Sequence, residues 1–149
     1  PPPPHNDPPP PQIYTVYKSS AASDVYKRQV LGTSADIVSF DAYGYFDRFI
    51  LYSDQIKAFL ESGKILAWGM VPTLNIEDLE KETSASLLRQ LKNKFKQVQA
   101  LGIDSEKLIN QSLVTPACGT GTLSVDLTKK VLSVTREISR EIRKANFLA

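Results

Sequence analysis

The stretch Ser112-Leu-Val-Thr-Pro-Ala-Cys-Gly-Thr-Gly-Thr-Leu-Ser124 runs from a short apolar strand through a glycine-containing turn into the start of a helix. Its turn presents Cys118, the only cysteine of the chain. In α/β proteins a turn at the end of a strand can aim one side chain and open backbone N–H groups toward a single point. The pattern therefore makes Cys118 a candidate functional position, although from residue type alone a lone cysteine is more often a small buried core residue.

Two further stretches have the apolar character of buried strands. Ala35-Asp-Ile-Val-Ser-Phe-Asp41 ends in an acid, and Ile65-Leu-Ala-Trp-Gly-Met-Val71 is stopped by Pro72. Together with the short apolar stretch above, the sequence predicts strands over 35–41, 65–71 and 113–115. Apolar residues at helical spacing predict amphipathic helices around 51–61, 85–101 and 123–145. Gly63 and Gly102 stand where the first two helices need C-terminal caps.

The alternation of strands and helices predicts an α/β fold with a parallel sheet built from right-handed βα units. Three strands cannot close a barrel, and an open sheet covered on one face leaves apolar strand surface and two unpaired edges. We therefore interpret the chain as the last three βα units of a larger TIM (β/α)8 barrel, with a doubly wound sheet as the alternative. Both folds bind ligands at the carboxyl ends of their strands, where this sequence has Asp41, the Pro72-Thr73 turn and Cys118.

The composition limits the classes of partner. An apolar fraction of 42% and a charged fraction of 23% in 149 residues are those of one globular domain. The near balance of 18 basic and 16 acidic residues favours neither a nucleic acid nor a membrane surface as partner. We expect no transmembrane helix, and a single cysteine fits a reducing, cytoplasmic setting.

The first 29 residues differ from the rest of the chain. Eight of the first eleven are proline, which predicts an extended, disordered tail. Residues 19–29 resemble translated adaptor sequence, so we expect 1–29 to be a non-native tail and the domain to span 30–149.

Asp41 and Cys118 together provide the oxygen and sulfur donors of half a zinc site. The only histidine is His5, in the proline-rich tail, so the chain alone does not supply a complete catalytic centre. From residue type alone, Asp41 is better interpreted as capping the helix that follows it. Thr73 on the second strand end, Tyr43 in an expected loop after Asp41, and Gly119 beside the cysteine are candidate substrate-binding residues.

Residues 35–43, 65–73 and 112–119, in this order and spacing, resemble the C-terminal part of the cobalamin-independent methionine synthase and uroporphyrinogen decarboxylase superfamily. The likeness covers about residues 30–145 and is greatest for methionine-synthase-like proteins. In that family a cysteine in a Pro-x-Cys-Gly context binds catalytic zinc, and Pro116-Ala-Cys118-Gly119 matches it. Asp41 stands where the family has a glutamate ligand, one methylene longer, so a role through a bridging water is the alternative. The family's His-x-Cys ligand pair has no counterpart here.

The resemblance implies zinc-dependent transfer of a methyl group to a thiol, as in methionine biosynthesis, with a folate or a corrinoid as methyl donor. It also implies that this chain alone is inactive, because ligands and the donor-binding half of the barrel are missing. A corrinoid-linked thiol methyltransferase of the same superfamily is the first alternative, and a metal-free decarboxylase is less well supported. An inactive piece or a βα module that binds a small molecule is the alternative from another class. The sequence does not indicate an oligomeric state.

Overall fold

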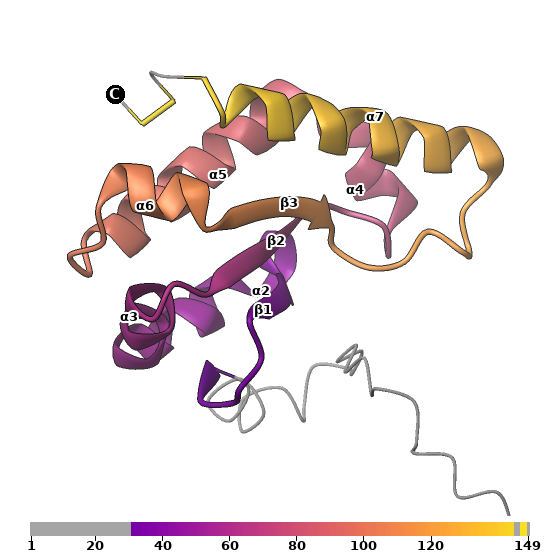
Figure 1. Cartoon of the computed structure of the whole chain (residues 1–149). Coiled ribbons are helices and arrows are strands. Elements are labelled where there is room, and N and C mark those ends of the chain that lie inside the picture. The colour runs from indigo at the N-terminus through magenta and orange to yellow at the C-terminus, as the bar shows by residue number, and fades with distance from the viewer. Residues whose placement is uncertain (1–30, 145–146, 149) are drawn as a thin grey trace, which may run out of the picture.

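The computed structural model describes residues 31–144 and 147–148, so the predicted tail over 1–29, His5 included, lies outside the described residues. Figure 1 shows the arrangement of the helices and strands. In chain order they are β1 (Ile37–Asp41), α2 (Ala42–Phe49), the 3-10 helix η1 (Ile50–Tyr52), α3 (Ser53–Glu61), β2 (Ile65–Val71), α4 (Ile76–Lys81), α5 (Ser84–Gln99), α6 (Ser105–Asn110), β3 (Ser112–Pro116) and α7 (Val125–Glu141).

The three strands form one parallel sheet in the order β1-β2-β3, which confirms the predicted α/β class. At the carboxyl end, Asp41 of β1 pairs with Gly69 of β2, and Gly69 pairs with Thr115 of β3. The register between β2 and β3 then shifts, so that Val71 pairs with Pro116. Each strand is adjacent to the next one in the chain, as in a series of right-handed βα units.

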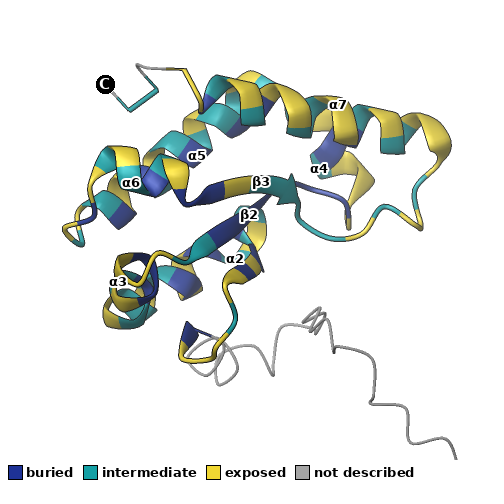
Figure 2. Ribbon diagram, in the orientation of Figure 1, coloured by how far each residue is buried: buried dark blue, intermediate teal, exposed yellow. Residues whose placement is uncertain are grey.

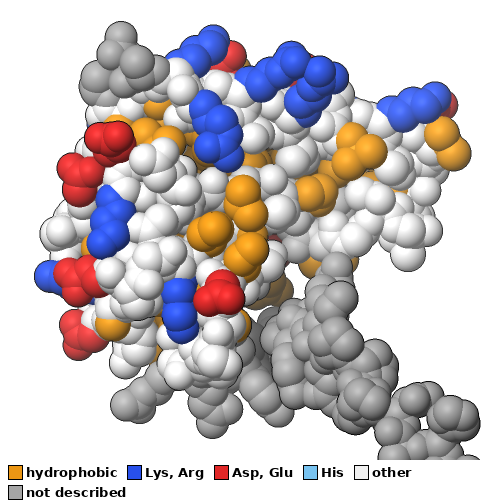
Figure 3. Space-filling view, in the orientation of Figure 1, with side chains coloured by type: hydrophobic (Ala, Val, Ile, Leu, Met, Phe, Trp, Pro, Cys, Tyr) orange, Lys and Arg blue, Asp and Glu red, His pale blue; other side chains and the backbone are white. Residues whose placement is uncertain are grey.

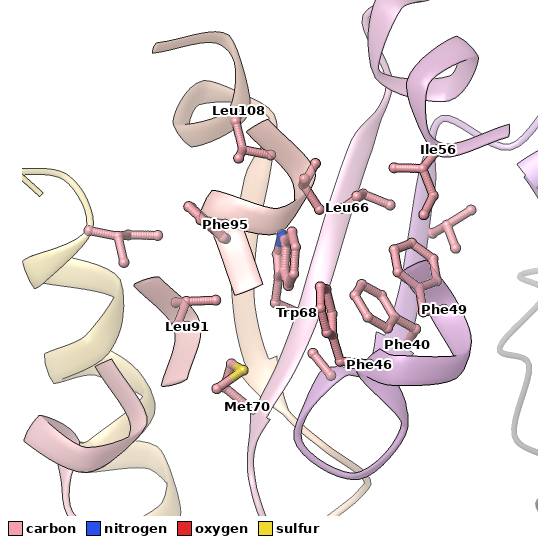
Figure 4. Packing of buried hydrophobic residues seen from close by; sticks show 14 of the residues in the cluster. Phe40, Phe46, Phe49, Ile56, Leu66, Trp68, Met70, Leu91, Phe95 and Leu108 are labelled. Carbon is pink, nitrogen blue, oxygen red and sulfur yellow. The ribbon is translucent and has the colours of Figure 1, made fainter. Parts of the chain in front are cut away.

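The core lies on one face of the sheet and is centred on Trp68 of β2, which is fully buried. Its ring centroid is 5.2 Å from that of Phe40 in β1, 6.1 Å from that of Phe46 in α2 and 4.8 Å from that of Phe95 in α5. Figure 4 shows these side chains converging between the strands and the helices. The indole N–H donates to the Ser112 hydroxyl over 3.0 Å, which leaves no unpaired donor inside this cluster.

The opposite face of the sheet is only partly covered. Exposed and buried residues alternate along β1, where Ile37 is 51% exposed, and Leu113 of β3 is 38% exposed. Figure 3 shows hydrophobic side chains gathered on the side of the molecule where β3 lies in front in Figure 1. Figure 2 shows the contrast with β2, which is buried, and with the outward side of α7, which is exposed.

Local sequence explains where the helices begin and end. The side chains of Asp41, Asn75, Thr83, Asp104 and Ser124 cap the N-termini of α2, α4, α5, α6 and α7. Gly63 and Gly102 follow α3 and α5 with φ of 84° and 90°, which confirms their predicted role as C-terminal caps.

Three helices were not predicted, namely α2, α4 and α6. The expectation that Tyr43 lies in a loop is wrong, because Asp41 caps a helix that begins at Ala42. Each of these helices has six or eight residues, too few to show a clear apolar stripe. In the described part of the chain, none of the helices combines the length and the apolar character that crossing a bilayer requires.

Candidate functional site

The site lies at the carboxyl end of the sheet, where three of the predicted residues follow or end adjacent strands. Asp41 ends β1, Thr73 comes two residues after β2, and Cys118 comes two residues after β3. The backbone N–H of Cys118 donates to Oγ1 of Thr73 over 3.1 Å. One residue earlier, the N–H of Ala117 donates to the carbonyl of Val71 over 2.8 Å. The turn that carries the cysteine is therefore fixed to the end of the central strand.

Asp41 has a structural role at this edge. Its Oδ1 accepts a hydrogen bond of 2.8 Å from the backbone N–H of Gly44 and so caps α2. A carboxylate at a helix N-terminus is stabilised by the unpaired N–H groups of the first turn. The interpretation of Asp41 as a helix cap is thus confirmed, and this cap holds the carboxylate at the same end of the sheet as Cys118.

The charge of Asp41 acts on the thiol. Burial raises the pKa of the Cys118 thiol, and the negative charge of Asp41 raises it further. Both effects favour the neutral thiol, because burial and a nearby anion each disfavour a thiolate. Cys118 is half-buried and forms no disulfide. The surroundings of Cys118 therefore disfavour its thiolate form.

Replacing Asp41 with asparagine should make Cys118 more reactive. Asparagine keeps the helix cap but removes the charge, so the thiol pKa should fall and the thiolate fraction should rise. We expect alkylation by iodoacetamide at mildly alkaline pH to become about two- to fivefold faster. Asp36→Asn removes the same charge at the other end of β1 and should leave the rate unchanged. Equal rates in the two variants would show that Asp41 does not act on Cys118.

Tyr43 is hydrogen-bonded to Glu82, a residue that the sequence did not indicate as part of the site. Its hydroxyl donates to Glu82, just after α4, over 3.1 Å. Gln90 donates to the same carboxylate oxygen over 2.9 Å, and the Ser86 hydroxyl donates to the other oxygen. Burial, followed by the hydrogen bond to Glu82 and its charge, raises the pKa of Tyr43 to about 12. Burial also acts to raise the pKa of Glu82, but the hydrogen bonds it accepts from Ser86, Gln90 and Tyr43 lower that pKa overall.

This network joins the first turn of α2 to the start of α5, so the Tyr43 hydroxyl is engaged within the fold. The polar run Glu82-Thr-Ser before an amphipathic helix marks a helix start in the sequence, but not its tyrosine partner. The interaction joins residues 39 positions apart.

The backbone near Cys118 is closely packed at Gly69 and loosely packed at Gly119 and Gly121. A Cβ placed on Gly69 would lie 2.8 Å from the Phe40 carbonyl oxygen and 2.9 Å from Cα of Ala117. A Cβ on Gly119 or Gly121 would meet nothing within 4 Å. Oγ1 of Thr115, in register with Gly69, is buried without a hydrogen-bond partner among the described residues. The backbone is thus close-packed at Gly69, whereas the positions of Gly119 and Gly121 face open space.

Zinc accepts thiolate and carboxylate donors, so Cys118 and Asp41 fit this metal in kind. Two donors are too few, because a catalytic zinc site takes three ligands from the protein. Within residues 31–144 and 147–148, no group of three or more histidine, cysteine, aspartate or glutamate side chains is placed to hold a metal ion. A zinc centre at this edge would need donors from outside the described residues.

No protein-family model, no curated protein and no solved structure matches this chain.

Proposed function

We propose that the chain is the C-terminal part of a methionine-synthase-like (β/α)8 barrel and that Cys118 is a zinc ligand of a thiol methyltransferase. The observation that carries the proposal is the placement of Cys118 beside the end of β2, with Asp41 at the same end of the sheet. The strand order, in which each strand is adjacent to the next, is that of successive units of such a barrel. The partly covered face, with Ile37 and Leu113, would line its interior.

The residues of this chain would have distinct roles. When bound, zinc would stabilise the thiolate of the acceptor at neutral pH. Cys118 would supply one sulfur donor, and Asp41 would contribute its carboxylate directly or through a water. The open space beside Gly119 and Gly121 would admit the acceptor thiol and the methyl donor, a folate or a corrinoid. The proposed setting is the cytoplasm, where thiols stay reduced.

The test requires the intact gene, recovered by genomic sequencing through the same locus. We expect the encoded protein to contain a His-x-Cys pair about one βα unit before Asp41 and to bind one zinc ion. Cys118→Ser should remove most of the zinc measured by mass spectrometry of the metal, since loss of one ligand weakens such a site strongly. Thr122→Ala changes an exposed residue of the same loop and should leave the zinc content unchanged.

Unchanged zinc in the Cys118→Ser protein would contradict the ligand assignment. An intact gene without the His-x-Cys pair would instead favour the non-catalytic binding module. A gene for a corrinoid protein next to it would favour the corrinoid-linked methyltransferase over the folate-dependent one.

A further inference from the structure

Thr73 is a polar residue that lies outside a strand and is nevertheless buried. It is only 3% exposed, and the two residues before it, Val71 and Pro72, are buried. Burying a hydroxyl costs free energy, and a hydrogen bond offsets that cost. Oγ1 of Thr73 accepts the backbone N–H of Cys118, a residue 45 positions later in the chain. This bond lies between the ends of two neighbouring strands.

The bond is the second of two consecutive links between the β3 end and the β2 end. Ala117 donates its N–H to the Val71 carbonyl, and Cys118 donates its N–H to the Thr73 hydroxyl. The next residue, Gly119, is exposed, and a Cβ placed on it would meet no atom within 4 Å. Among the described residues, the bond to Thr73 therefore comes just before the chain enters the exposed part of the loop at Gly119. Without that bond, Cys118 would belong to the loop.

We infer that Thr73 is the positioning residue of Cys118: its hydroxyl fixes the cysteine backbone, and thereby the place of the thiol, instead of contacting substrate. The inference rests on the proposed function only for what the thiol does in the intact protein. The placement of the thiol is a property of this chain alone. Serine keeps the hydroxyl that makes the link, whereas valine has the shape of threonine and cannot accept the bond.

The test uses the whole chain and its single cysteine, so that a thiol reagent reports on one residue. Thr73→Val should free the turn and expose the half-buried thiol, which should make alkylation by iodoacetamide about three- to tenfold faster. Thr73→Ser should stay within about twofold of the natural chain. Thr122→Val, an exposed position of the same loop, is the matched control and should not change the rate.

Amide hydrogen exchange separates positioning from a general loss of stability. In Thr73→Val the amide of Cys118 should lose protection, while the amide of Leu66, bonded to the Gln111 carbonyl over 2.9 Å in the same sheet, should keep it. The inference is overturned if Thr73→Val alkylates at the natural rate, or if protection falls equally at both amides. Absence of zinc from the intact protein would instead contradict the proposed function and would leave the result on Thr73 unaffected.

Discussion

Replacing Trp68 with alanine is expected to lower the free energy of unfolding by about 3–5 kcal/mol. The side chain is fully buried on β2 and contacts aromatic rings from β1, α2 and α5, so its removal would leave a cavity where these three elements meet. The hydroxyl of Ser112 would also lose its donor, although it would still donate to the Leu108 carbonyl. Lost packing therefore accounts for most of the expected effect.

Urea unfolding followed by far-ultraviolet circular dichroism is the suitable measurement, because Trp68 is the only tryptophan and its fluorescence disappears in the variant. Leu132→Ala on α7 is the control. Leu132 is 56% exposed, so its truncation should change the stability by no more than about 0.5 kcal/mol. A loss below about 1 kcal/mol for Trp68→Ala would mean that the aromatic cluster is not the centre of the core.

The strands and the larger helices could be predicted from the sequence because each carries its own pattern. Predicted strands over 35–41, 65–71 and 113–115 correspond to β1, β2 and β3, with ends that differ by at most two residues. The predicted helices over 85–101 and 123–145 correspond to α5 and α7, of which α7 is shorter at both ends. The helix predicted over 51–61 is divided, because η1 precedes α3. Buried parallel strands and long amphipathic helices can be predicted from the local pattern of apolar residues, with little further information.

The contacts that define the site could be predicted only in part. Because parallel strands end at a common edge, the sequence indicated that Asp41, Thr73 and Cys118 would lie at one end of the sheet. It gave no sign that Thr73 accepts the Cys118 amide or that Tyr43 donates to Glu82. Such bonds join segments that lie far apart in the sequence, and their partners are selected by tertiary packing, which leaves no periodic pattern in the sequence.

Gly69→Ala should lower the free energy of unfolding by about 1–3 kcal/mol and shift the turn that carries Cys118. On backbone entropy alone, alanine should stabilise a strand by about 0.5–1 kcal/mol relative to glycine. The added Cβ, however, would lie 2.8 Å from the Phe40 carbonyl oxygen and 2.9 Å from Cα of Ala117. Both are backbone atoms, which cannot turn aside as a flexible side chain does. We therefore expect the steric cost to exceed the entropic gain.

Gly119→Ala is the matched control, because the same methyl group there meets nothing within 4 Å and the residue has no positive φ. It should leave the stability unchanged or raise it by up to about 1 kcal/mol. Gly69→Ala should thus lower the urea midpoint and Gly119→Ala should not, although the chemical change is the same. Gly69→Ala should also alter the alkylation rate of Cys118, because the clash moves Ala117, the residue before it. If Gly69→Ala were as stable as Gly119→Ala and kept the natural alkylation rate, β2 would not set the position of the cysteine turn.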